Sequence, residues 1–193
     1  MAETTQESAT RLRTRTAILD AAIQVFSRDR NASMSDLAVA AGVGRSTLHR
    51  YFPERTDVVR AAARHVMHQA DAVTRRIDPA SRPPLEALHR MIEAHLDFAP
   101  AVLWLSTEPL VQDDPALWEE YSATEAAVDG LFLRAAELLH PGLPPAWIKR
   151  VMLALLYTAG EAERDGVMTR HETYTAILTT LTDGVLPGAP PRP

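Results

Sequence analysis

Apolar side chains along this chain recur with the period of an α-helix. In residues 11–28 they fall at positions i, i+1, i+4, i+7 and i+8, which form one stripe on a helix: Ile18, Leu19, Ala22, Val25 and Phe26. Further segments with this period follow, separated by glycine and proline, and no segment of strand length alternates between polar and apolar residues. The pattern predicts an all-α protein.

Three helices, the second and third of them short, are predicted near the start of the chain. Residues 33–36, Ser-Met-Ser-Asp, match the S-x-x-D capping box, so Ser33 is the expected N-cap of the second helix. Gly42 ends that helix, because a residue without Cβ accepts the left-handed conformation of a tight turn. A third helix covers residues 44–51, and Pro53 is expected to stop it and to begin a long helix that reaches about residue 77. Two short helices joined by the turn AGVG are typical of a helix-turn-helix.

Most side chains of the third predicted helix are not needed in a core. Leu48 and, directly after the helix, Phe52 are the residues expected to point inward. A recognition helix in the major groove needs side chains that reach outward, donate and accept. The candidates are Arg45, Ser46, Thr47, His49 and Arg50. The segment predicts a DNA-reading face; the alternative is an ordinary solvated face of a surface helix.

Composition narrows the class of protein. The chain has 193 residues, of which 46% are hydrophobic, which is enough for a real core. It contains no cysteine, so disulfides and thiolate metal sites are excluded, and a reducing compartment, the cytoplasm, is expected. No run of about 18 uncharged apolar residues occurs, and the first residues lack the apolar region of a signal peptide. We therefore expect a soluble protein with no membrane partner.

Charge is distributed unevenly along the sequence. The net charge is −5, yet residues 1–76 carry 12 arginines against 8 acidic residues, whereas residues 77–193 carry 17 acidic residues against 8 basic ones. A cationic front favours a polyanion such as nucleic acid as its partner. Arg11, Arg13 and Arg15 lie near the start of a helix, where cations oppose the helix dipole. A nearby phosphate backbone explains them; a frayed, solvated helix end is the alternative.

These patterns divide the chain into four parts. Residues 1–10 are expected to form a disordered arm, residues 11–56 a DNA-binding domain, residues 57–186 a helical domain for ligand binding and dimerisation, and residues 187–193 a disordered tail. The helices expected after residue 77 cover residues 85–98, 101–106, 116–140, 145–165 and 171–186. Proline-rich joints, including residues 78–84 and 109–115, separate several of them.

The front of the chain resembles the N-terminal DNA-binding domain of TetR-type bacterial repressors. The resemblance covers residues 15–60 and rests on a composite pattern: ILDAA followed by Phe26, then DLAVAAGVGRSTLHRYF, then FPER leading into a long helix. It implies an all-α regulator of about this length with a divergent body after the DNA-binding domain. It also implies a homodimeric repressor that binds a palindromic double-stranded DNA operator and is released when a small-molecule effector tilts the fourth helix.

The resemblance assigns roles to individual residues. Tyr51 belongs to the group that contacts bases and phosphates in the family, and Arg55 stands where a lysine commonly binds phosphate. The complete predicted DNA-binding set is Ser33, Arg45, Ser46, Thr47, His49, Arg50, Tyr51 and Arg55. Gly44 replaces a usual serine and so removes an N-cap side chain. His49 replaces a usual tyrosine, and because histidine titrates near neutrality, a pH-sensitive affinity for DNA is expected.

An effector pocket is predicted in the body of the chain. Aromatic, methionine and imidazole side chains are the usual lining of a small-molecule site between helices. The predicted ligand-binding residues are Met91, His95, Phe98, Trp104, Trp118, Tyr121 and Glu125. The alternative is that these residues are plain core. Glu125 and Asp129 share one helix face, which hints at a cationic ligand, but an ordinary solvated acidic face is the simpler explanation.

The last two predicted helices carry apolar stripes wider than one layer needs. The predicted dimer-interface residues are Trp147, Val151, Leu155, Tyr174, Ile177 and Leu181. The resemblance favours the interface, because members of the family pair these helices into a four-helix bundle. The alternative is burial within the monomer.

Two other functions stay open on sequence alone. A helix-turn-helix activator or coregulator that acts through protein contacts has the same pattern. A helical-bundle enzyme or metal protein is the second, since His65 and His68 are spaced i, i+3, but neither has an acidic neighbour in a coherent ligand set, and His89 and His95 do not share a helix face well. We therefore expect no catalytic residue, no metal and no cofactor.

Overall fold

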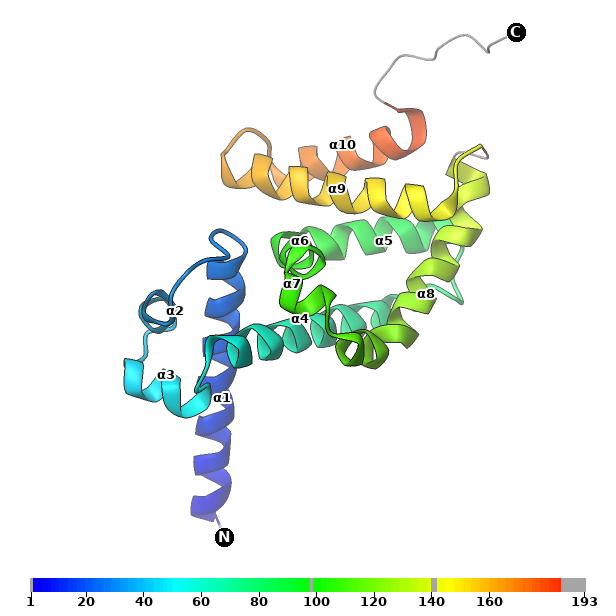
Figure 1. Cartoon of the computed structure of the whole chain (residues 1–193). Helices are drawn as coiled ribbons and strands as arrows, with labels where there is room; N and C mark the ends of the chain where they lie inside the picture. Colours follow the sequence, from blue (N-terminus) through cyan, green and yellow to red (C-terminus); the bar gives the residue numbers. More distant parts are fainter. Residues whose placement is uncertain (1, 98, 140–141, 185–193) are drawn as a thin grey trace, which may run out of the picture. The chain divides into compact units, whose positions relative to one another are not determined.

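The computed structural model describes residues 2–97, 99–139 and 142–184, and within them it is built from helices without a strand (Figure 1). The helices are α1 Ala2–Phe26, α2 Met34–Ala40, α3 Arg45–Tyr51, α4 Arg55–Ile77, α5 Pro84–Leu96, α6 Ala99–Thr107, α7 Pro109–Gln112, α8 Pro115–Leu139, α9 Pro145–Arg164 and α10 Arg170–Asp183. The predicted all-α class with an N-terminal helix-turn-helix is confirmed.

The chain divides into two compact units. The first, called the head unit here, comprises residues 1–69 and 100–118; the second, called the body unit, comprises residues 70–99 and 119–193. Helices α4, α6 and α8 contribute residues to both. The predicted functional division at residues 56 and 57 stays a prediction, because compactness alone does not test it.

Disorder was predicted at both ends of the chain, and the structure describes only the first of these two segments. The structure places helix α1 from Ala2 onward, where a disordered arm over residues 1–10 was predicted. The arm's own composition does not oppose this, because most of its residues are helix-compatible and continue into a strong helical segment. The predicted tail, residues 187–193, lies outside the described residues, as does Phe98.

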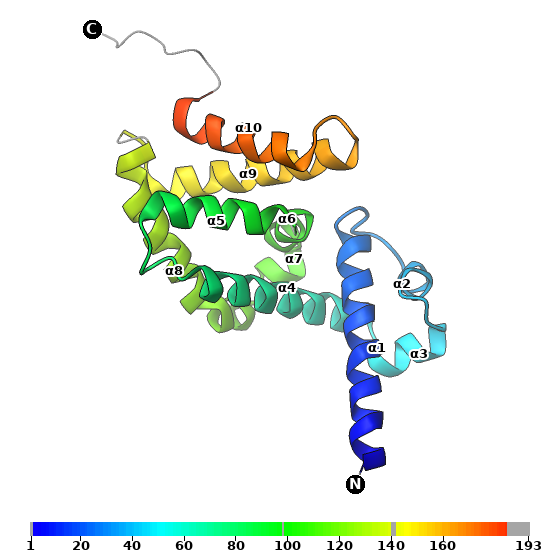
Figure 2. The same cartoon turned by 180° about the vertical axis from the view of Figure 1, so that it is seen from behind.

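The head unit has a small core shared by its first four helices. Helix α1 packs on α2, and α2 packs on α3 (Figure 2). Ile18, Leu37, Leu48 and Val58, one from each helix, are fully buried. Burying each such side chain stabilises the fold by about 1.5–3 kcal/mol. This core fixes α3 against the rest of the head unit.

The turn between α2 and α3 is a Schellman motif. Gly42 has a φ of 64°, the left-handed region that glycine adopts without strain. Its N–H donates to the carbonyl oxygen of Val39 at 3.1 Å, and the Val43 N–H donates to that of Ala38 at 3.0 Å. Two carbonyl groups that the end of α2 leaves open are thereby satisfied, and the chain turns directly into α3.

The body unit has a larger core between α5, α8, α9 and α10. Helices α9 and α10 lie side by side, and both contact α5 (Figure 1). The buried residues of this core are Leu88, Ile92, Leu96, Phe132, Ala136, Ile148, Met152, Leu156, Ala159 and Ile177. A capping box of Thr169 and Glu172 begins α10. The amphipathic stripes of the last two helices are therefore used at least partly inside one chain.

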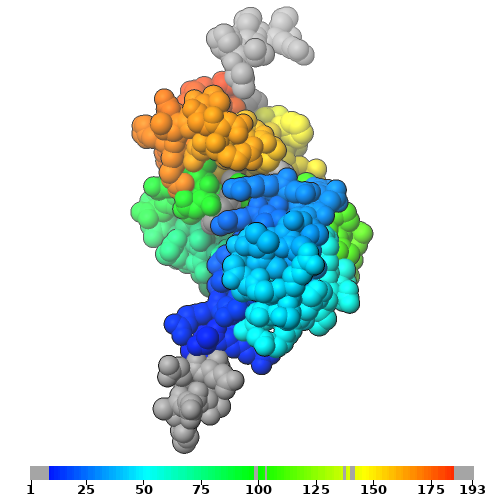
Figure 3. Space-filling view, turned by 90° about the vertical axis from the view of Figure 1, so that its left-hand side faces the viewer, coloured from blue at the N-terminus to red at the C-terminus, as the bar shows by residue number. Residues whose placement is uncertain are grey.

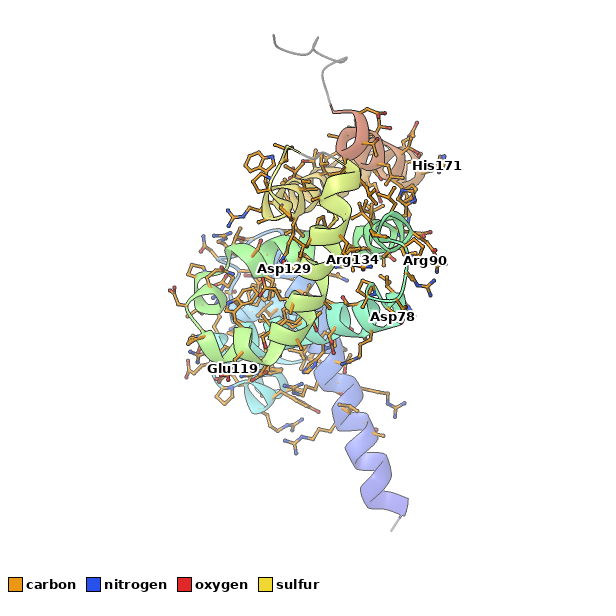
Figure 4. All side chains as sticks on the ribbon, turned by 90° about the vertical axis from the view of Figure 1, so that its right-hand side faces the viewer. Asp78, Arg90, Glu119, Asp129, Arg134 and His171 are labelled. Carbon is orange, nitrogen blue, oxygen red and sulfur yellow. The ribbon has the colours of Figure 1, made fainter. Side chains whose placement is uncertain are left out.

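The loop after α4 is held by arginine side chains. Asp78, with a φ of 50°, ends α4, and Arg134 of α8 donates to the carbonyl oxygens of Pro79 and, at 3.3 Å, Arg82 (Figure 4). Arg82 in turn donates to the Ile77 carbonyl oxygen at 2.6 Å. The bond to Ile77 satisfies a carbonyl group at the end of α4, and the other two satisfy carbonyl groups of the loop.

Two helix boundaries differ from those expected. Pro53 does not begin α4: the helix starts at Arg55, and the Asp57 carboxylate in its first turn accepts the N–H of the preceding Glu54 at 3.0 Å. The segment after Pro109 was predicted as an interruption, but it forms the short helix α7, whose N-cap Glu108 accepts from Leu110 N–H. In both cases a side-chain hydrogen bond lies at the start of the observed helix. In the described parts of the chain, no helix combines the length and apolar character needed to cross a bilayer.

Candidate nucleic-acid interface

Helix α3 presents its polar side chains outward. Leu48 is 0% exposed, and Phe52 is buried just beyond the helix. Four of the predicted DNA-binding residues on α3 are exposed: Arg45, Ser46, His49 and Arg50. Thr47 and Tyr51 are half-buried. The predicted orientation of α3 therefore agrees with its burial pattern, while contact of these side chains with DNA stays a prediction.

The N-termini of α2 and α3 are capped differently. Ser33 accepts the Asp36 N–H at 3.3 Å, and Asp36 accepts the Ser33 N–H at 2.9 Å, so the predicted capping box is confirmed. The Ser33 hydroxyl also donates to the Asp36 carboxylate at 2.7 Å, and this bond, with that from the Ser33 backbone, holds the pKa of Asp36 below its usual value. Gly44 caps α3 without a side-chain hydrogen bond. Ser33 thus has a structural role, and its DNA contact stays a prediction.

His49 is oriented by the end of its own helix. Its Nδ1 lies 3.2 Å from the carbonyl oxygen of Pro53, so a proton on Nδ1 donates to that oxygen. The opposite nitrogen, Nε2, is then the one left to meet a partner.

Arg55 has a structural role that sequence reasoning missed. Its Nε donates to the carbonyl oxygen of Ala32 at 3.3 Å, and its Nη2 donates to that of Arg30. Its guanidinium carbon lies 4.8 Å from the centre of the Phe26 ring. The side chain thereby joins the start of α4 to the loop after α1. No local sequence motif predicts these contacts of Arg55, because its hydrogen-bond partners lie more than 20 residues away in the sequence. Its predicted phosphate contact stays a prediction.

Replacing Arg55 with methionine is expected to lower the free energy of unfolding by about 1–3 kcal/mol, because two charge-assisted hydrogen bonds and the contact with Phe26 are lost. Thermal unfolding followed by circular dichroism measures this change. Arg28→Met, an exposed arginine in the same unit, is the matched control and should stay within about 0.5 kcal/mol of the unaltered chain. Equal stability of the two variants would assign Arg55 no structural part.

Two tryptophans of the predicted effector set belong to the head unit. Trp104 is buried and stacks on Phe26, with ring centroids 5.8 Å apart and an interplanar angle of 19°. Trp118 is half-buried and donates from Nε1 to the Val111 carbonyl oxygen at 3.0 Å. Within the head unit, an ion pair joins α4 to residues 100–118: the Arg60 Nε lies 3.3 Å from the Asp114 carboxylate. Trp104 therefore contributes to packing, and contact of either tryptophan with a ligand stays a prediction.

The remaining described members of the effector set lie in the body unit. Met91 is fully buried in a cluster with Ile77, Ala87 and Leu131. His95 is buried one turn later, and its Nδ1 lies 2.8 Å from the Met91 carbonyl oxygen. Burial lowers the pKa of His95, so the neutral ring, with its proton on Nδ1, is favoured.

Tyr121 and Glu125 lie one helical turn apart on α8. Burial, together with the carboxylates of Glu125 and Asp71, raises the pKa of Tyr121 to about 12, so its phenol stays protonated at neutral pH. The Lys149 Nζ lies 3.5 Å from Glu125 and 2.6 Å from Asp129. The acidic face that suggested a cationic ligand is therefore already matched by a cation of the protein itself.

Acidification is expected to destabilise the chain through His95. Its pKa is lower in the folded state than the ordinary 6.5, so the unfolded state takes up the proton first, and stability present above this value is lost as the pH falls. His95→Asn keeps a donor near the Nδ1 position and removes the titration. Between pH 7.5 and 5.5 its unfolding free energy should depend less on pH, by up to about 1.4 kcal/mol per unit. Urea unfolding at several pH values tests this, with the exposed His89→Asn as control; equal slopes for the unaltered chain and His95→Asn contradict it.

The predicted dimer residues occupy α9 and α10 in three different settings. Trp147 is 55% exposed, whereas Ile177 is 2% exposed and belongs to the body core. The half-buried members are Val151, Leu155, Tyr174 and Leu181. Trp147, Val151 and Leu181 line a hollow of about 240 Å³ between the start of α9 and the end of α10. For Ile177, burial within the monomer accounts for the apolar stripe; for the others, the interface stays a prediction.

Among the histidines considered as metal ligands, His65 is engaged by neighbouring polar side chains. His65 contacts Asp20 at 3.0 Å and Gln69 at 3.1 Å, and His68 is exposed. Within residues 2–97, 99–139 and 142–184, no group of three or more acidic or histidine side chains is arranged to hold a metal ion. These described side chains therefore offer no coordination set for a metal ion.

Comparison with known proteins agrees with this architecture. Residues 18–62 match the model of a family described as bacterial regulatory proteins, tetR family. The chain is 46% identical over 180 residues to the HTH-type transcriptional repressor LfrR of Mycolicibacterium smegmatis, which covers 93% of this chain and 94% of the relative. It is 30% identical over 152 residues to the HTH-type transcriptional regulator NfxB of Pseudomonas aeruginosa, with 75% and 79% covered.

A crystal structure of the TetR-like transcriptional regulator LfrR from Mycobacterium smegmatis, in complex with proflavine, is similar to this chain. It matches with a TM-score of 0.74 and 44% identity, over 92% of this chain and 99% of that one. The resemblance carried by residues 15–60 is thus confirmed and extends through nearly the whole sequence. The chain belongs to the TetR family of bacterial regulatory proteins and is a DNA-binding transcriptional regulator.

Proposed function

We propose that this chain is a homodimeric repressor that binds a palindromic operator through α3 and is released by an aromatic small molecule. The observation that carries the proposal is the outward face of α3, where four polar residues are exposed on a helix anchored by Leu48. The similarity to a named repressor along 93% of the chain supports the sign of the regulation.

The case for a dimer begins with the short reading element. Helix α3 has seven residues, so one copy contacts only a few base pairs, and helix-turn-helix proteins gain specificity by pairing two copies on two half-sites. The exposed Trp147 and the half-buried Val151 give α9 an apolar surface beyond the body core, whereas Leu155 packs against that core. A stable dimer typically buries about 1,200–2,000 Å² in total. We place the interface on α9 and α10.

The proposed effector is aromatic because LfrR has been crystallised with proflavine and is similar over 92% of this chain. Tyr121 is a half-buried aromatic side chain that stays uncharged at neutral pH, which suits contact with an aromatic ligand. Glu125 and Asp129 already form ion pairs with Lys149, which argues against a site where these two carboxylates alone attract a cationic ligand. A cation would have to compete with the Lys149 ammonium group for these carboxylates. Aromatic contact is therefore the main expected source of affinity.

The test uses the full chain and labelled duplex DNA from upstream of its own gene. Fluorescence anisotropy is expected to show binding to this duplex in preference to a scrambled duplex, and light scattering should report a dimer. Proflavine is then titrated, with its binding verified through the tryptophan fluorescence of the chain. Release of the duplex as proflavine binds supports the proposal. Equal DNA affinity with and without bound proflavine contradicts effector release.

The direction of regulation needs a reporter. A promoter fused to the bound duplex is expected to be less active when the chain is present and to regain activity when proflavine is added. The Leu48→Ala chain should leave the promoter active under both conditions. Higher reporter activity in the presence of the chain would identify an activator instead.

A further inference from the structure

The core-facing stripe of α1 continues beyond the core as arginine. Ile18 and Ala22 are buried on this face, and positions 11 and 15 lie on the same face, seven and three residues before Ile18. An apolar stripe at these positions would only extend the core. Arg11 and Arg15 are exposed instead. The face thus changes from apolar to cationic where α1 passes the end of α3.

These two arginines lie over aromatic residues at the end of α3. The Arg11 guanidinium carbon is 5.8 Å from the ring centre of Tyr51, and that of Arg15 is 5.5 Å from the ring centre of Phe52. Arg50 approaches the Tyr51 ring as well, at 6.0 Å. A guanidinium held over an aromatic ring loses part of its freedom but keeps N–H groups to donate at its edge. The aromatic rings therefore support the cations beside α3.

The cations on this face are not balanced by the protein. Within the described part of the chain, no carboxylate forms an ion pair with Arg11, Arg15 or Arg50. Elsewhere in the same chain arginines do pair, as Arg60 does with Asp114 and Arg75 with Asp71. An unpaired group of cations repels itself and attracts a polyanion. In the space-filling view, the dark-blue part of α1 that follows the grey residues lies next to the cyan α3 on one face (Figure 3).

We propose that Arg11 and Arg15 of α1, together with Arg50, form a phosphate-binding arm beside the recognition helix. The arm contacts the sugar-phosphate backbone of the same duplex whose bases α3 reads, and it rests on the proposed function, since α3 must already face DNA. Arginine suits this partner because its planar fork donates to phosphate oxygens in pairs. The arm extends the footprint of each subunit without adding base recognition.

An arm of this kind predicts a particular dependence on salt. Each phosphate neutralised by an arginine releases condensed counterions, so the logarithm of the binding constant falls with the logarithm of salt concentration by about 0.9 per contact. The contribution does not depend on base sequence. It can therefore be measured on a duplex of arbitrary sequence, before the operator is known.

The test compares the unaltered full chain with the double variant Arg11→Gln and Arg15→Gln. Binding to a labelled 30-base-pair duplex of arbitrary sequence is followed by anisotropy between about 50 and 300 mM KCl. The slope of the double variant is expected to be shallower by about 2 per subunit. Its melting temperature should stay close to that of the unaltered chain, because both side chains are exposed.

Two further variants separate phosphate contact from a structural role. Arg28→Gln removes an exposed arginine at the other end of α1 and is expected to keep the slope of the unaltered chain. Lysine at both positions 11 and 15 keeps the charges and is expected to regain most of the slope. A Gln double variant with an unchanged slope overturns the arm and leaves the proposed function standing. Absence of any binding by the unaltered chain overturns both.

Discussion

Replacing Arg45 and Thr47 together with alanine is expected to weaken operator binding by roughly 100-fold or more, while the melting temperature changes little. The physical reason is the setting of the two residues: Arg45 is exposed at the start of α3, and Thr47 is only half-buried. Loss of a base or phosphate contact typically costs about 1–3 kcal/mol per contact, and a dimer loses each one twice. Anisotropy with the upstream duplex measures the affinity, and circular dichroism measures the melting temperature.

The matched control for this variant is Arg76→Ala, which removes an exposed arginine from the last turn of α4. It is expected to bind the operator like the unaltered chain. A fall of more than about 5 °C in the melting temperature of the Arg45 and Thr47 variant would show that these side chains support the fold, because a shift of that size corresponds to roughly 1 kcal/mol or more. The outward assignment of α3 would then be wrong.

Leu48→Ala is expected to have the opposite profile, a large loss of stability with DNA binding lost as its consequence. Leu48 is 0% exposed and is the one residue of α3 that reaches the core of the head unit. Truncating a fully buried leucine removes apolar contacts and leaves a cavity, which together cost about 2–5 kcal/mol. Urea unfolding followed by circular dichroism measures the change.

Leu12→Ala provides the comparison for Leu48→Ala, since Leu12 is 64% exposed on α1 of the same unit. Its unfolding free energy should stay within about 0.5 kcal/mol of the unaltered chain. If Leu48→Ala were equally stable, the packing of α3 against the head unit would not depend on this side chain. The chain has two compact units, and each can unfold in its own transition. Each transition in the unfolding curve of a variant is therefore compared with the corresponding transition of the unaltered chain.

The local features of the head unit were predictable because short-range chemistry decides them. The capping box of Ser33 and Asp36 needs only four consecutive residues, and the left-handed turn at Gly42 needs only the missing Cβ. The inward position of Leu48 follows from helical period. Interactions among a few neighbouring residues determine such features, so they can be predicted from one sequence without knowledge of the fold.

Other features depend on partners far away in the sequence. Arg55 was predicted as a phosphate ligand, and only the fold brings it to the carbonyl groups of the loop after α1 and to the ring of Phe26. Trp104 was assigned to an effector site, and its stacking on Phe26 joins residues 78 positions apart. A side chain with both polar and apolar character suits several such environments. Its residue type alone does not choose among them.

The last two helices show a different limit. Apolar stripes on α9 and α10 indicate burial but do not say by which partner, because a neighbouring helix and a second subunit exclude water equally well. Ile177 is covered within its own chain, and Trp147 is not. Only the fold distinguishes the two.

The structure separates the residues that hold α3 from the residues that it presents, and this separation makes α3 suitable for redesign. A library intended to change operator preference can vary positions 45, 46, 49 and 50, whose side chains are exposed. It should keep Gly42, Leu48 and Phe52, which set the turn and the packing of the helix. Members of such a library are expected to share one melting temperature while differing in the duplex they select from a random pool, so that new specificity is screened without first screening for folding.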